Sequence, residues 1–179
     1  VPCVDVLEAV VQDPESQPLR LLNADADALV EDVARLLAGV TERAVRETVG
    51  RRFPDMHREL LAAAGRLRAR LASEAARALH DLTACQQSYV WTDEERFLGQ
   101  MGEFRAERPN AGEAARAIAG AYVQTVAATL ADAGPKAVMR HLVRAYCDGC
   151  RVAMCEALTS DLLREDDGVV ERRRVLGDV

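Results

Sequence analysis

The residues best suited to chemistry in this sequence are cysteines near its C-terminal end. Cys147 and Cys150 form a CxxC pair, a spacing found in zinc sites and in redox-active dithiols. Residues three apart share one face of a helix, but Cys155 lies about 140° around the helix from Cys150. A structural zinc ion needs four ligands, and neither a second CxxC nor a nearby histidine pair supplies them. We therefore predict no metal ligands, and we favour small buried or half-buried helix residues over redox chemistry.

Histidine and serine offer no recognisable catalytic set either. None of the three histidines, His57, His80 and His141, lies in the Glu-x-x-His spacing by which a helical bundle binds two iron ions. Ser88 has no histidine close in sequence, which leaves open a partner brought near by folding. The chain also lacks GxxxxGK[ST] and GxGxxG, the loops that bind nucleotide phosphates. We predict no catalytic residue and no cofactor-binding residue in this chain.

Composition predicts an all-α protein. Hydrophobic residues make up 49% of the 179 residues, enough for a sizeable core, whereas aromatic residues make up 4%. Strong helix formers dominate the rest of the composition. The formal net charge of −6 argues against a nucleic-acid partner. The sequence has no run of about 18 apolar residues and no basic start of a secretory signal, so we expect a cytoplasmic location.

The N-terminal segment, residues 1–24, gives no clear structural prediction, and a helical periodicity of apolar residues begins after it. A first helix is predicted from about Asp25 to about Gly50. Its core-facing stripe is expected at Leu29, Val33, Leu36 and Val40. A second helix is predicted after Pro54, and it runs for over thirty residues, about 50 Å, to about Val90. The absence of a methionine at the first position suggests processing or a piece of a longer chain, and we favour a piece.

The second half of the chain adds a loop and two more helices. Residues 92–112 lose the helical period and are predicted to form a tip loop. A third helix, residues 113–163, matches the second in length. Two such helices bury their stripes by lying antiparallel, so we predict an elongated antiparallel helical bundle. A short helix over residues 169–179 is expected after a hinge at Asp166-Asp167-Gly168.

Gly134-Pro135 interrupts the apolar stripe of the third helix. Apolar residues step by four on both sides of the pair, at Ile118, Tyr122, Val126 and Leu130 and then at Val138 and Leu142. A proline inside a helix removes one backbone donor, costs about 3 kcal/mol and usually kinks the helix. Two interpretations stay open: one kinked helix, or a helix that ends at Gly134 and another that begins at Pro135.

Three blocks of this sequence, in the same order, resemble the C-terminal part of the dynamin superfamily of large GTPases. The first block is Arg52-Phe53-Pro54, at the start of a long helix. The second is CQQSYVWTDEERFLG, which matches the family at Ser88, Tyr89, Thr92 and Phe97 and departs from it at Trp91, Glu94 and Arg96. The third and most specific is AYVQTVAATLADAGPKAVMRHLV, with matches at Tyr122, Val126, Asp132, Pro135, Lys136, Ala137, Met139 and Leu142. The tail resembles the family's acidic run and paired arginines.

The resemblance covers about residues 25–179 and implies a division of the chain. Residues 25–91 would be the end of the middle domain, which forms stalk helices, and residues 113–179 would be the GTPase effector domain. The long parent protein would bind GTP and Mg²⁺ in a GTPase domain that this chain lacks, and it would remodel membranes through stalk assembly. A kink at the proline-lysine pair would lie where the stalk helix bends.

The resemblance also implies the partners. Stalks are expected to self-associate, and the last helix is expected to dock on the parent's GTPase domain and its flanking helices. The residues that resemble or line this docking helix are Val169, Arg172, Arg173 and Leu176. The tip at residues 93–108 carries five acidic and three basic residues and leaves no room for a pleckstrin-homology domain, so membrane contact is expected to be indirect.

Two other functions compete with this interpretation. A free-standing helical adaptor for protein partners would show the same periodic stripes, since heptad-like stripes are common. A catalytic helical protein would need a site that the sequence does not reveal. Bundle periodicity alone does not require the three blocks in this order, so we favour the dynamin-like stalk. The coding sequence upstream of this chain would distinguish the first two, because a stalk requires a GTPase domain there.

Overall fold

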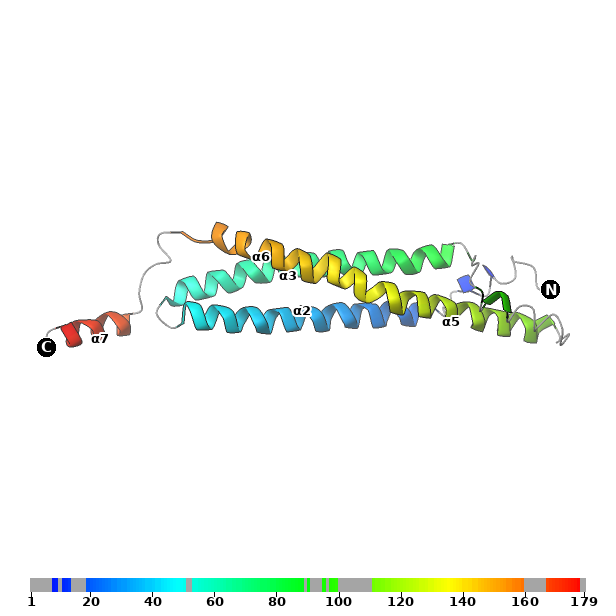
Figure 1. Cartoon of the computed structure of the whole chain (residues 1–179), viewed down its shortest axis with the longest axis horizontal. Helices are drawn as coiled ribbons and strands as arrows, with labels where there is room; N and C mark the ends of the chain where they lie inside the picture. The colour runs from blue at the N-terminus through cyan, green and yellow to red at the C-terminus, as the bar shows by residue number, and fades with distance from the viewer. Residues whose placement is uncertain are drawn as a thin grey trace. The chain divides into compact units, whose positions relative to one another are not determined.

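The structure, a computed structural model, describes residues 8–9, 11–13, 19–50, 53–88, 90, 95, 97–99, 111–159 and 167–177. Its helices are labelled in Figure 1. Their bounds are α2 Arg20–Thr48, α3 Pro54–Ser88, α5 Ala111–Val138, a π-helix Met139–Arg144, α6 Ala145–Glu156 and α7 Asp167–Gly177. Every regular element among these residues is a helix, so the prediction of an all-α protein is confirmed. The elongated antiparallel arrangement stays a prediction.

The link between α2 and α3 uses the two residues best suited to such a turn. Val49 still donates its amide to the carbonyl of Val45 at 2.9 Å, and Gly50 then adopts a positive φ of 59°, which glycine accepts without steric cost. Pro54 begins α3, where its missing N–H is no loss. The carbonyl of Phe53 accepts the first bond of that helix, from the amide of His57 at 2.9 Å. Phe53 and Pro54 of the first matched block therefore open α3, whereas Arg52 lies outside the described residues.

Contacts divide the chain into two compact units. The first unit comprises Val1–Leu29 and Ala76–Val138, and the second comprises Val30–Ala75 and Met139–Val179. The boundary between Val138 and Met139 coincides with the change from α-helix to π-helix. The helices α2 and α3 each contribute residues to both units.

The core of the first unit gathers around α5. Its buried residues are Val11, Leu19, Val90, Phe97, Ile118, Ala121, Tyr122 and Val126. Val11 and Leu19 are fully buried although they belong to the segment that periodicity left unassigned. Their burial shows that part of this N-terminal segment packs into the first unit's core.

In the second unit the core-facing side of α2 differs from the predicted one. Its buried residues are Val30, Thr41 and Val45. In the predicted stripe, Leu36 is 70% exposed and Val40 is 68% exposed. The prediction was wrong because α2 carries apolar residues over an arc wider than one stripe, and periodicity alone does not select the part of that arc that faces the core.

The third helix passes through Gly134-Pro135 without a break. Pro135 lies inside α5, so the alternative of a helix ending at Gly134 is wrong. Buried residues recur every four positions along most of this helix, at Ala114, Ile118, Tyr122, Val126, Gly134, Val138, Leu142 and Tyr146. A step of four drifts about 40° around an α-helix, and the π-helix, which has more residues per turn, reduces that drift where it occurs. A kink of the helix axis stays a prediction.

Two boundaries near the C-terminal end differ from the predicted ones. The helix predicted to reach Leu163 ends with α6 at Glu156, and Leu158 beyond it is 44% exposed and joins no apolar stripe. The last helix begins at Asp167, so two residues of the predicted hinge lie within α7. No helix in the described part of the chain is both long enough and apolar enough to cross a bilayer.

Candidate functional site

Side chains cap the C-terminal turn of α3. The last carbonyls of a helix have no donor within that helix and need other partners. The hydroxyl of Ser88 donates to the carbonyl of Cys85 at 3.1 Å, and the phenol of Tyr122 donates to the carbonyl of Gln86 at 2.9 Å. The side-chain amide of Gln12 donates to the next carbonyl, that of Gln87, at 3.1 Å. Two residues singled out from the sequence, Ser88 and Tyr122, thus end α3 and tie it to α5.

Tyr122 also joins two of the matched sequence blocks. Its ring is 1% exposed and meets the ring of Phe97 edge-on, with centroids 6.1 Å apart and an interplanar angle of 75°. Burial raises the pKa of the Tyr122 phenol, so the phenol keeps the proton that it donates to α3. Tyr89 and Thr92, from the same block as Phe97, lie outside the described residues.

The remaining matched residues of the third block lie on two sides of the helix. Leu142 is fully buried, whereas Met139 is 55% exposed. Pro135 and Lys136 are exposed, and Lys136 forms an ion pair with Asp132 one turn earlier, Nζ to Oδ2 2.5 Å. An exposed pair of this kind contributes little stability. Pro135, Lys136 and Met139 are therefore surface residues, and Leu142 is a core residue.

A second buried tyrosine, Tyr146, joins α6 to α2. The phenol oxygen of Tyr146 lies 2.7 Å from the hydroxyl oxygen of Thr41, and that hydroxyl lies 2.7 Å from the carbonyl of Leu37. A threonine hydroxyl has one proton, so its bond to Leu37 leaves Tyr146 as the donor to Thr41. Burial raises the pKa of Tyr146, so the phenol keeps the proton that it donates to Thr41.

Residues 110–178, which contain α5 to α7, match the sequence profile of the dynamin GTPase effector domain. This region is similar to that domain, and we refer to it as the effector domain. This domain contains α5, the π-helix, α6 and α7, and it includes both buried tyrosines. No curated protein matches the chain.

The cysteines of the effector domain are free thiols. Cys150 is half-buried, whereas Cys147 and Cys155 are exposed. The expectation of buried or half-buried cysteines therefore holds for Cys150 and is wrong for the other two. Among the described residues, no group of three or more His, Cys, Asp and Glu side chains lies close enough together to hold a metal ion.

Sequence reasoning did not single out Tyr146 or Thr41. Tyr146 follows Leu142 by four positions and so continues the stripe that was recognised, which is the signal that identifies it. Thr41 lies four residues before the buried Val45 on α2, and a threonine within an apolar stripe is the corresponding signal. Both would have been found by extending the buried stripes to polar residues.

The last helix of the effector domain exposes apolar side chains. Val170 is 48% exposed and Val175 is 59% exposed, while Val169 is half-buried. Arg172 and Arg173 of the family's paired arginines are both exposed. The backbone of Leu176 lies within α7, and its side chain is outside the described residues. The structure therefore places Val169, Arg172 and Arg173 on one short helix.

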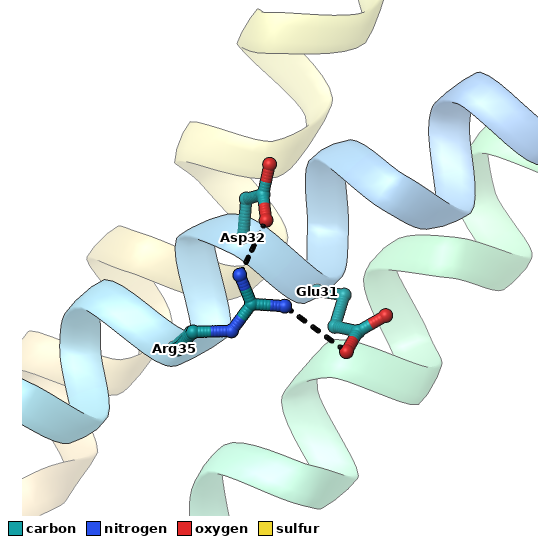
Figure 2. Close-up of polar contacts among 3 residues, drawn as sticks. All are labelled: Glu31, Asp32 and Arg35. Carbon is teal, nitrogen blue, oxygen red and sulfur yellow. Dashed lines mark hydrogen bonds and ion pairs between the residues drawn. The ribbon is translucent and has the colours of Figure 1, made fainter.

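The exposed side of α2 combines apolar residues with an ion-pair cluster. Figure 2 shows Arg35 between two carboxylates, with Nη2 3.1 Å from Glu31 and Nη1 2.9 Å from Asp32. Next to this cluster, Leu36, Gly39 and Val40 line a groove together with Arg43. On this side of α2, the side chains of Leu36 and Val40 stay more than half exposed.

Proposed function

We propose that this chain is the stalk and effector portion of a dynamin-like GTPase, where it mediates self-assembly and couples assembly to GTP hydrolysis in membrane remodelling or fission. The observation that carries the proposal is the effector-domain match, which covers α5, the π-helix, α6 and α7. The helices α2 and α3 precede that domain as the end of a middle domain would. The chain itself supplies no phosphate-binding loop, so GTP and Mg²⁺ bind in the parent's GTPase domain.

The exposed side of α2 supports the assembly role. When the neighbouring helices of a bundle cover only part of a helix's apolar side, a further helix is needed to cover the rest. We propose that stalk contacts cover Leu36 and Val40, either from other helices of the parent or from a second stalk. Light scattering at rising protein concentration tests self-association, and a strict monomer at high concentration and low salt would count against it.

The proposed partner of α7 is the parent's GTPase domain with its flanking helices. An isolated helix of eleven residues is marginal in water, and it gains stability when a groove covers one apolar face of it. We propose that Val169 and Leu176, two turns apart on α7, form the docking face, with the paired Arg172 and Arg173 beside it. Membrane association of the parent would then be peripheral, from a cytoplasmic location.

The experiment measures binding of the separately produced GTPase domain with its flanking helices to this chain. Leu176→Ala should weaken binding more than tenfold, because truncating a buried leucine costs about 2–5 kcal/mol. Val169→Ala should weaken it by a smaller factor. Val170→Ala is the matched control, since the same side chain is removed one residue away, about 100° around the helix. Equal affinities for all four proteins would show that this stripe is not the docking face.

A further inference from the structure

A pocket of about 250 Å³ opens between α2, α3 and α5 within the first unit. Small residues line part of it, Ala26 from α2 and Ala127, Ala131 and Gly134 from α5. Protein interiors contain few voids larger than a water molecule, and a cavity of about 150 Å³ already accepts benzene. The pocket therefore has room for an organic molecule of one or two rings.

The walls of the pocket are mainly leucine side chains. Leu22 and Leu29 come from α2, Leu79 from α3 and Leu130 from α5. Leu79 is 3% exposed, and it forms a buried side of the pocket next to Gly134, where a Cβ atom would lie 3.8 Å from Leu79 Cδ2. The apolar body of a ligand would replace water against these side chains, which is the main source of affinity in such pockets.

The polar groups of the lining residues accept hydrogen bonds and do not donate them. The hydroxyl of the buried Thr83 donates to the carbonyl of Leu79 at 3.3 Å, so its remaining capacity is to accept. Pro135 has no N–H and cannot make the usual helical bond to the carbonyl of Ala131. Asp25 adds a carboxylate, and none of the described lining residues is Lys, Arg or His.

We propose that this pocket binds a small organic amine, with its apolar body among the leucines and its N–H groups directed to the acceptors. An ammonium or amine group supplies the donors that the pocket lacks, and a positive charge is attracted by Asp25. A carboxylate of the same shape brings neither a donor nor a favourable charge. Pro135, which lines the pocket, also leaves the carbonyl of Ala131 without its usual helical donor. This role goes beyond the stalk function and does not depend on it.

Binding at this place also stabilises the first unit. The ligand touches three helices that come together only in the folded chain, so it favours the folded state by mass action. The temperature of unfolding should therefore rise with amine concentration and reach a value set by the affinity. The same rise should be absent for a compound that does not enter the pocket.

The test uses the full chain and 2-naphthylmethylamine as the probe, with 2-naphthoate as its anionic counterpart. Binding is measured by calorimetry and by the shift in unfolding temperature, at probe concentrations up to about 1 mM. We expect saturable binding of the amine and at least about tenfold weaker binding of the carboxylate. Absence of saturable amine binding, or equal binding of the two compounds, would overturn the proposal.

Two variants locate the site, each with a matched control. Ala127→Leu fills the pocket and should abolish amine binding, whereas Ala128→Leu places the same side chain on the exposed side of α5 and should leave binding unchanged. Asp25→Asn should weaken amine binding severalfold, and Asp81→Asn on the exposed side of α3 should not. If Ala127→Leu loses its helical circular dichroism, the Asp25 pair decides. Two results would contradict the assignment. One is an unchanged amine affinity in Asp25→Asn together with an Ala127→Leu variant that folds and still binds the amine. The other is an unchanged amine affinity in Asp25→Asn when Ala127→Leu does not fold.

Discussion

The two buried tyrosines of the effector domain show how two regions of one helix are attached in different ways. In the first unit, Tyr122 donates to a main-chain carbonyl at the end of α3 and packs against Phe97. In the second unit, Tyr146 donates to the side chain of Thr41 on α2. A main-chain acceptor is present whatever residue occupies its position, whereas a side-chain acceptor is lost by one substitution. The hydrogen bond of Tyr122 therefore depends on the identity of Tyr122 alone, whereas the hydrogen bond between Tyr146 and Thr41 depends on the identity of both residues.

The largest effect is expected where the ring itself is removed. Tyr122→Ala should lower the free energy of unfolding by about 3–5 kcal/mol, since it deletes an aromatic side chain from a packed core and leaves a cavity. Tyr122→Phe should cost about 1 kcal/mol, because it removes only the hydrogen bond to Gln86. Urea unfolding followed by circular dichroism measures both. Equal costs for the two substitutions would mean that the ring contributes nothing beyond its hydroxyl.

The Tyr146–Thr41 pair should behave as a coupled unit. Thr41→Val should cost about 1–3 kcal/mol, because it leaves the buried phenol of Tyr146 with a lost acceptor. Combining it with Tyr146→Phe should recover part of that loss, because removing both partners leaves no unpaired group. A double-mutant cycle in urea gives the coupling energy. Strictly additive costs would show that the 2.7 Å contact has no energetic role.

Alkaline pH should affect both attachments in the same direction. Burial raises the pKa of Tyr122 and Tyr146 above the ordinary value of 10.0, so between the two values the folded chain holds protons that the unfolded chain has released. The stabilisation is fully present below pH 10 and is lost as pH rises through the folded-state pKa. In Tyr122→Phe and Tyr146→Phe the fall in stability above that pH should be shallower. An unchanged slope in both variants would contradict the raised pKa values.

The smallest effects concern helical glycines, and here the two units should respond alike. Gly120 on α5 and Gly39 on α2 both lie inside helices, and a Cβ atom at either would have no neighbour within 4 Å. Each substitution to alanine should raise the free energy of unfolding by about 0.5–1 kcal/mol. Gly50→Ala is the contrasting change and should lower it by about 1 kcal/mol, since its φ is positive. A loss of stability at Gly39 or Gly120 would show that the space is occupied.

Periodicity identified the core side of the third helix because its large apolar residues recur at a spacing of four. Ile118, Tyr122, Val126, Val138 and Leu142 were recognised from their spacing and all are buried. The same reasoning failed for α2, where Val30 and Leu29 are adjacent apolar residues and the structure buries Val30 while leaving Leu29 37% exposed. Which half of a wide apolar arc faces the core depends on the packing of the other helices, which spacing along one helix does not contain.

The sequence could identify a residue of the candidate site only where the type and spacing of that residue mark it. Tyr122 was singled out from the sequence, but its acceptor is the carbonyl of Gln86, and a main-chain group has no signature in a sequence. The π-helix after Val138 was not predicted either. It keeps the buried stripe in register, and no residue type in the sequence specifies it. Proline at position 135 indicated irregularity nearby without specifying its form.

GTP hydrolysis tests most directly whether this chain acts as the effector portion of a dynamin-like GTPase, as we propose. The parent's GTPase domain with its flanking helices is assayed with and without saturating amounts of this chain, and the chain alone serves as the control. We predict that the chain alone neither binds nor hydrolyses GTP, and that adding it raises the rate of hydrolysis by the GTPase domain. A rate that stays unchanged when the chain is saturating, or hydrolysis by the chain alone, would contradict the account.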